Sequence, residues 1–317
     1  MRAFTIFVCA LALPACSEAI RRPIWPTDAT SDLSQVTRSN DNEIDPSISP
    51  DGKSLAYTMA AMQGAASRVA VASIGDPDHP SYTAVGREPT WMPDSSGIVF
   101  VARITDASPE KLVQSFGHNE HRPIFLADVG DPNLLAMTPA VAPSGKLVAV
   151  SMRDVTVHDP AWPTEHHVDL GIALTDLGGR SGVDVIARGT DPSFSPDGKH
   201  IAFVKRSATD GHEHLYVANA DGSEAAQITD GPADDEEPSW SPDGSQIVFC
   251  SAHGNDQEFV QANLFVVKPD GSGLVQLTEG DRIACHPTWA KDGTVYFHAN
   301  ATGRFHIWKL QLARSQG

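Results

Sequence analysis

The chain has 317 residues, 20% of them charged and 7% aromatic, and its formal net charge at pH 7 is −17. An excess of acidic side chains repels nucleic-acid phosphates and anionic lipid headgroups, so the composition argues against binding either by charge. It favours basic protein partners or metal cations, although many exported proteins are acidic for solubility alone. A chain of this length predicts two ordinary domains unless it is built from repeats.

Residues 1–15 are Met-Arg followed by a nearly unbroken apolar stretch. One positive charge and so short an apolar core predict a secretory signal peptide, since a membrane-spanning helix needs a longer segment. The stretch ends in Leu13-Pro14-Ala15-Cys16, which resembles the cleavage box of bacterial lipoproteins. This resemblance implies lipidation of Cys16 and, because Ser17 follows, attachment to the outer membrane. The alternative is cleavage after Ala19, which gives a soluble periplasmic protein.

Residues 16–32 are polar, contain two prolines and are predicted to form a tether. The segment Gln35-Val36-Thr37 then resembles the later strand sequences Gln227-Ile228-Thr229 and Gln276-Leu277-Thr278, but it precedes every repeat described below. The last repeat ends after the strand 306–310 without such a segment. We therefore expect the N-terminal strand to complete the last repeat, because closing a ring removes an exposed strand edge.

A turn signal recurs along the chain. In Ser195-Pro196-Asp197-Gly198 the proline presets φ, the aspartate bonds back to its own backbone, and the glycine takes a positive φ, so the sequence predicts a β-hairpin. The same box begins with the prolines at positions 46, 89, 139, 192, 238 and 287. A period of roughly 40 to 50 residues is typical of a four-stranded propeller blade.

A second hairpin completes each unit, as at Asn219-Ala220-Asp221-Gly222 and Lys268-Pro269-Asp270-Gly271. Boxes such as Pro238-Ser239-Trp240-Ser241-Pro242-Asp243-Gly244 resemble those of the TolB-like (PD40, WD40-like) β-propellers. The resemblance covers residues 33–312 and implies an all-β, six-bladed propeller of four-stranded antiparallel blades, with residues 313–317 as a C-terminal tail. It extends to the propeller of TolB only, because no counterpart of its N-terminal α/β domain is expected.

The residue before each box proline begins an innermost strand, so these six ring residues should surround one mouth of the axial channel. They are Asp45, Glu88, Thr138, Asp191, Glu237 and His286, with Glu43, Asp235 and Glu236 close by. Because like charges around a pore repel unless screened, Asp45, Glu88, Asp191, Glu237 and His286 form a candidate metal site. Oxygen ligands favour Ca²⁺ or Mg²⁺, and His286 leaves Mn²⁺ or Zn²⁺ open. Alternatively, the acids cap backbone amides and face water.

Histidines gather in the segments between the second and third strands of the units. They are His118, His121, His158, His166, His167, His212, His214 and His253. Oligogalacturonate lyases with related propellers bind a metal through channel-face histidines, so this resemblance implies a metal-dependent enzyme as one reading. The other reading is that these histidines are solvated on exposed loops.

Cys250 and Cys285 remain after the signal. Cys250 is expected at the end of the second strand of the fifth unit, and Cys285 at the start of the first strand of the sixth. These two points lie on one face in neighbouring units, so an oxidising compartment permits a disulfide. The alternative is two small buried thiols.

The sequence has no Gly-x-Ser-x-Gly elbow, no His-Glu-x-x-His motif and no phosphate-binding glycine loop. We therefore predict a non-catalytic scaffold for protein–protein interaction in the bacterial periplasm. We expect a monomer with an envelope or periplasmic protein partner, and membrane contact through a lipid anchor only. The alternative is a metal-dependent polysaccharide (uronate) lyase, or a related envelope enzyme, that uses the acidic and histidine residues of the channel face.

Overall fold

The computed structural model describes residues 33–60, 66–103, 110–116, 120–124, 134–154, 168–177, 184–255, 258–280 and 282–312. The predicted signal peptide, Cys16, the tether and the C-terminal tail lie outside these residues. In the described ranges no helix has both the length and the apolar character needed to cross a membrane.

Within these described residues, the strands form one seven-stranded sheet and four four-stranded sheets. The seven-stranded sheet contains β2 (Asn42–Ile48), β3 (Ser54–Ala60), β4 (Arg68–Ser73), β5 (Asp76–Trp91), β6 (Gly97–Arg103), β7 (Glu110–Phe116) and β8 (Glu120–Ile124). The next sheet contains β9 (Leu134–Val141), β10 (Leu147–Asp154), β11 (Val168–Asp176) and β12 (Asp184–Ala187). The third contains β13 (Thr190–Phe194), β14 (His200–Arg206), β15 (Glu213–Asn219) and β16 (Ala226–Gln227).

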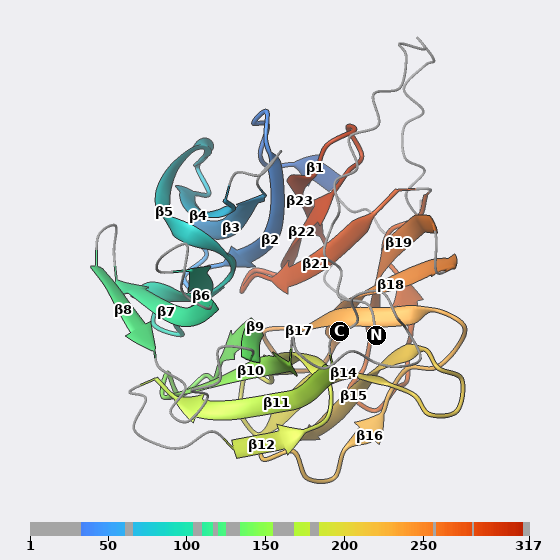
Figure 1. Ribbon diagram of the computed structural model, residues 1–317. Helices are drawn as coiled ribbons and strands as arrows, with labels where there is room; N and C mark the ends of the chain where they lie inside the picture. The colour runs from blue at the N-terminus through green and yellow to red at the C-terminus, as the bar shows by residue number, and fades with distance from the viewer. Residues whose placement is uncertain are drawn as a thin grey trace.

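The fourth sheet contains β17 (Asp234–Trp240), β18 (Ile247–Asn255), β19 (Glu258–Val267) and β20 (Val275–Gln276). The fifth joins both ends of the described chain, with the strand order β1 (Leu33–Gln35), β23 (His306–Gln311), β22 (Thr294–Ala299) and β21 (Ala284–Trp289). Figure 1 shows the sheets around a common centre, with β2, β9, β17 and β21 nearest to it and β8, β12 and β16 at the outside. The first strands contact one another in a closed circle, in the order β2, β5, β9, β13, β17, β21 and back to β2.

The box turns form as their sequence predicts. Gly198 N–H donates to the carbonyl of Ser195 at 2.8 Å, and the Ser195 hydroxyl donates to Asp197 at 2.6 Å. Gly198 has a φ of +68°, which a side chain would resist. The indole N–H of a box tryptophan also ties neighbouring first strands together, since Trp240 donates to the carbonyl of Ser193 at 3.0 Å. The box is thus both a hairpin turn and a contact between sheets.

The prediction of six separate four-stranded units is wrong in one respect, because the described strands form five sheets. β5 runs without a break from its pairing with β4 into its pairing with β6. The pairing changes from β4 to β6 between Val85 and Gly86, where a Cβ on Gly86 would come 2.6 Å from the carbonyl oxygen of Val101. Glycine therefore permits the close approach of β5 to β6 at this point.

The predicted closure by the N-terminal strand is confirmed. β1 pairs antiparallel with β23, and Gln35 lies opposite Trp308. Val36 N–H donates to the carbonyl of Ile307 at 2.7 Å, and Ile307 N–H donates to the hydroxyl of Thr37 at 3.0 Å. In the fourth and fifth units, Thr229 and Thr278 accept the amides of Leu215 and Leu264 in the same way. The similarity among these three segments therefore reflects one shared hydrogen-bond pattern.

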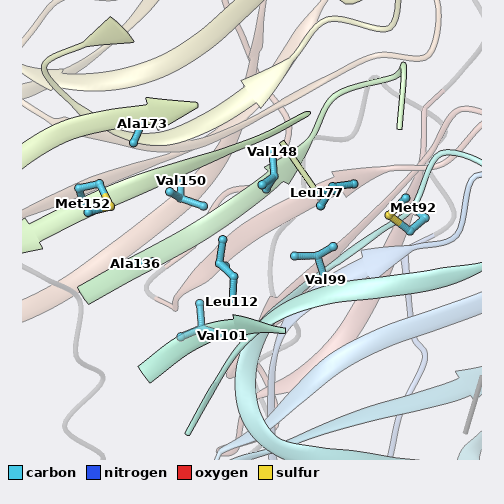
Figure 2. Packing of buried hydrophobic residues seen from close by; sticks show 10 residues of the cluster. All are labelled: Met92, Val99, Val101, Leu112, Ala136, Val148, Val150, Met152, Ala173 and Leu177. Atoms are coloured by element: carbon cyan, nitrogen blue, oxygen red, sulfur yellow. The ribbon is translucent and has the colours of Figure 1, made fainter. Parts of the chain in front are cut away.

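Apolar clusters fill the spaces between neighbouring sheets. Figure 2 shows one cluster, in which Val99 and Leu112 from the seven-stranded sheet pack against Val148 and Val150 of β10. Within the seven-stranded sheet, Val69 and Phe100 belong to another cluster, so its two halves pack against each other. Burying each such side chain contributes about 1.5–3 kcal/mol, and these contacts hold the first strands in their circle.

Candidate functional site

The six ring residues share an unusual backbone conformation. Their φ angles lie between 45 and 58°, in the left-handed region, and each precedes a proline: Asp45, Glu88, Thr138, Asp191, Glu237 and His286. At each of them the pairing register between the first and second strands shifts, which marks a β-bulge. Left-handed non-glycine residues cost of order 1–3 kcal/mol each, and they gather at functional sites. The repeated strain makes this ring the candidate site.

The backbone amides of the ring residues are held by acceptors from the preceding unit. Three amides donate to side chains on second strands: Glu88 to Thr58 at 3.0 Å, Asp191 to Ser151 at 3.0 Å and Asp45 to His298 Nδ1 at 3.3 Å. Two others donate to the carboxylate of the preceding ring residue: Thr138 to Glu88 at 2.6 Å and His286 to Glu237 at 2.5 Å. Two acids of the ring therefore cap backbone amides, which was one alternative read from the sequence.

His286 lies between two carboxylates. Its Nδ1 is 2.7 Å from Glu237 Oε1 and 3.4 Å from Asp45 Oδ1. Burial favours the neutral imidazole, but the charges of Glu237 and Asp45 outweigh it and raise the pKa of His286 to about 10. Burial also acts on Glu237, yet the nearby His286 lowers the pKa of that carboxyl. At neutral pH an imidazolium therefore supplies positive charge at this part of the ring.

His298 on β22 is a site residue that the sequence analysis missed. Its ring stacks on that of His286 with centroids 5.7 Å apart, and burial lowers the pKa of His298 to about 3. The imidazole is therefore neutral, and its Nδ1 accepts the Asp45 amide. Comparison of the repeats could have identified His298. It lies opposite the residue before His286, just as Thr58 in β3 lies opposite the residue before Asp45.

Two other ring carboxyls, Asp45 and Asp191, have pKa values raised toward neutrality. Burial, followed by the charges of Glu88 and Glu237, raises the pKa of Asp45 to about 6, although His286 opposes the rise. Burial and then Glu237 raise the pKa of Asp191 to about 7. Glu88 is paired with Arg87. The predicted repulsion among ring acids is thus relieved by protons, by His286 and by Arg87.

A buried carboxyl pair lies beside the ring, and the sequence analysis noted only one of its members. Glu236 is 7% exposed, and burial together with Glu213 raises its pKa well above the usual range. Burial also raises the pKa of Glu213, although the charge of Arg206 and a hydrogen bond with Glu236 oppose the rise. Arg206 lies 3.7 Å from Glu213, and Asp234 accepts the Glu213 amide at 2.9 Å.

Glu43 and Asp235, which the sequence places near the ring, lie beside histidines of neighbouring sheets instead. Glu43 lies 3.0 Å from His306 Nδ1, and Asp235 lies 3.6 Å from His214 Nδ1. Glu43 and Asp235 are both buried. These pairs join each first strand to the third strand of the preceding unit.

The loop histidines have varied positions. His118, His158, His166 and His167, and the side chain of His121, lie outside the described residues. His214 is in β15 and is fully buried, so it is not a solvated loop residue. His212 lies 3.2 Å from Asp234, and His253 in β18 lines a cavity of about 450 Å³ with Gln261 and Glu279. None of the three described histidines contacts the ring residues.

Cys250 and Cys285 are joined by a disulfide, with Cα atoms 5.0 Å apart. Cys285 is near the start of β21, as expected, but β18 continues to Asn255, so Cys250 lies within its strand and not at its end. The bridge links β18 of the fifth unit to β21 of the sixth unit, next to Glu237 and His286.

Of the predicted metal ligands, the structure brings Asp45, Glu237 and His286 into contact, while Glu88 contacts Thr138. Asp191 interacts with the others through its charge. A tighter set combines Asp45, His286 and His298, which offer one ligand atom each within 4.8 Å of one another. One carboxylate and two imidazoles suit a transition metal better than Ca²⁺. Binding there requires His286 to lose its proton.

The comparisons with known proteins agree on the fold. Residues 180–262 match the PD40 family, described as the TolB beta propeller domain. No curated protein matches the chain. The chain is similar to the structure of a putative TolB from Agrobacterium tumefaciens, with 17% identity and a TM-score of 0.59 over 90% of this chain and 99% of that one.

Two further structures are similar at the same level. For TolB from Acinetobacter baumannii the identity is 16% and the TM-score 0.56, over 84% of this chain and 65% of that one. For an oligogalacturonate lyase from Vibrio parahaemolyticus the identity is 13% and the TM-score 0.56, over 93% and 97%. Identities this low show a shared fold and carry no information about activity. The chain thus has the fold of an all-β propeller with four-stranded antiparallel blades, and residues 180–262 match the TolB beta propeller domain.

Proposed function

We propose that this chain is a non-catalytic interaction scaffold in the bacterial envelope. The observation that supports it is the pairing of ring groups with one another: His286 binds Glu237 and Asp45, and the amides of Thr138 and His286 bind carboxylates. In a catalytic centre an acid, a base or a bound metal must be able to reach the substrate. Here these groups instead form hydrogen bonds and ion pairs between neighbouring units.

The propeller has six blades in this proposal, and the seven-stranded sheet counts as two blades that share β5. The N-terminal part of β5 pairs with β4, its C-terminal part pairs with β6, and the two halves pack face to face. Six blades also match the six box prolines. Residues 1–15 act as the signal peptide and 16–32 as the tether of an outer-membrane lipoprotein anchored at Cys16, with a soluble periplasmic form as the alternative.

The partner is an envelope or periplasmic protein that presents positive charge. The formal net charge of −17 favours such a partner, and Asp234 is an acidic residue near the ring. Electrostatic complementarity raises association rates and makes binding depend on salt. We expect a monomeric chain that contacts the membrane through its anchor.

A pull-down tests this function: immobilised full-length protein is incubated with an envelope extract at low and at high salt. The bound proteins should include a partner that is lost at high salt and is captured less well by Asp234→Asn. Asp221→Asn is the matched control, because Asp221 lies in the turn between β15 and β16, at the opposite end of the strands. Equal capture by wild type and Asp234→Asn would contradict a role for this acidic residue.

A second candidate is a metal-dependent uronate lyase, favoured by the set Asp45, His286 and His298. A metal held there would polarise the carboxylate of a uronate, and loss of the adjacent proton would then lead to elimination. Elemental analysis of the purified protein, followed by a lyase assay with added Mn²⁺, Zn²⁺, Ca²⁺ or Mg²⁺, separates the two functions. Turnover that disappears in His298→Gln would establish the enzyme and overturn the scaffold.

A further inference from the structure

Cys250 occupies a position that faces the ring. In β3, β10 and β22, an equivalent position lies two residues beyond the partner of the residue that follows the box proline. It is occupied by Thr58, Ser151 and His298, and each accepts a ring amide. The corresponding residue of β18 is Cys250, two places beyond Val248. Its sulfur is bonded to Cys285, so the His286 amide donates to Glu237 instead, at 2.5 Å.

The carboxylate of Glu237 therefore lies beside two sulfurs. One oxygen of Glu237 and the sulfurs of Cys250 and Cys285 all lie within 4.8 Å of one another. Cys250 is fully buried, Cys285 is 7% exposed, and the side chain of Glu237 is 16% exposed. His286 follows Cys285 directly in the chain, and its Nδ1 is 2.7 Å from Glu237. Two sulfurs, a carboxylate and an imidazole are therefore gathered at the contact between two sheets.

We propose that reduction of the Cys250–Cys285 disulfide creates a binding site for a thiophilic divalent metal, with Zn²⁺ as the type. Its ligands are the two sulfurs and Glu237, and His286, whose Nδ1 lies 2.7 Å from Glu237, would supply the fourth. Zinc binds thiolate, carboxylate and imidazole ligands in tetrahedral sites. The proposal does not depend on the scaffold function, because it concerns the redox chemistry of the fold itself.

A dithiol can serve as the reductant of the Cys250–Cys285 disulfide. The dithiol supplies two electrons and two protons, the bond between the sulfurs of Cys250 and Cys285 breaks, and the reductant closes into its own disulfide. The metal then displaces both thiol protons and binds two thiolates. A bound cation also offsets the repulsion between these thiolates and Glu237, which would otherwise disfavour three negative charges at a buried contact.

Cobalt(II) is the probe, because it substitutes for zinc and reports thiolate ligation in its absorption spectrum. The full-length protein is reduced with a dithiol, freed of it without oxygen, and titrated with Co²⁺. We expect one equivalent to bind, with a sulfur-to-cobalt charge-transfer band and the visible bands of a tetrahedral site. The oxidised protein should give neither. Excess Zn²⁺ should remove the bands and protect two thiols from a thiol reagent.

Glu237→Gln should weaken cobalt binding by about tenfold or more. The matched control is Glu279→Gln, an exposed carboxamide outside the site that should bind as wild type does. Cys285→Ser should abolish the charge-transfer band, and the thiol-protection measurement on reduced wild type serves if that variant does not fold. The proposal is overturned if reduced wild type shows no thiolate–cobalt band, if zinc protects no thiols, or if Glu237→Gln binds cobalt as tightly as Glu279→Gln.

Discussion

Replacing Thr37 by valine measures what the N-terminal strand contributes to stability. The Thr37 side chain is fully buried, and its hydroxyl accepts the amide of Ile307 at 3.0 Å across 270 positions of sequence. Valine has nearly the same volume but offers no acceptor. The substitution therefore leaves the packing almost unchanged and leaves the Ile307 amide without its hydrogen-bond partner.

A buried backbone donor without a partner costs about 1–3 kcal/mol. For a large domain, each kcal/mol lowers the melting temperature by about 2–4 °C, so Thr37→Val should lower it by about 2–12 °C. Thermal scans followed by circular dichroism give the melting temperature. Urea titration of the same samples gives the change in the free energy of unfolding independently of any aggregation on heating.

Thr278→Val is the matched comparison. Thr278 accepts the Leu264 amide at 2.8 Å, which is the same bond made within one continuous stretch of chain. If the N-terminal strand belongs to a closed ring, both valine variants should be destabilised to a similar extent. Wild-type stability of Thr37→Val beside a destabilised Thr278→Val would refute the reasoning, because the strand would then pair with β23 without contributing to the fold.

Three further predictions concern the ring and the anchor. His286 has a pKa of about 10 against an ordinary value of 6.5, so its stabilising contribution is complete below pH 6.5 and is lost as pH rises through 10. The difference in melting temperature between wild type and His286→Gln should shrink over that range, and parallel pH profiles would contradict this. Burial and Glu237 raise the pKa of Asp191 from 3.8 to about 7, so the stability that its protonation supplies is lost between those values. Asp191→Asn, which tolerates the positive φ, should gain stability relative to wild type as pH rises from 4 to about 7, whereas a constant difference would exclude the raised pKa. Cys16→Ser should move the protein from the membrane fraction to the soluble periplasm, and wild type that takes up no labelled palmitate would rule out the anchor.

Much of this fold follows from local sequence. Ser195-Pro196-Asp197-Gly198 forms a turn because its φ preferences and side-chain hydrogen bonds act within a few residues, so the hairpins could be predicted wherever the box recurs. Thr37 could be assigned to the last unit because Gln35-Val36-Thr37 resembles Gln227-Ile228-Thr229 and Gln276-Leu277-Thr278 in sequence. Regular repetition also placed the ring residues at equivalent positions.

Tertiary structure decided the features that depend on contacts between distant segments. His298 contacts the ring residues because β22 pairs with β21 and the imidazole stacks on His286. The residues next to His298 in the sequence give no indication of these contacts. β5 continues from its pairing with β4 into its pairing with β6 without a break, which only the folded chain reveals. The charge states of His286 and Asp191 depend on burial and on carboxylates brought from other sheets. Local preferences could therefore specify the repeated strands and turns, whereas the chemistry of the ring is a property of how the units pack around one centre.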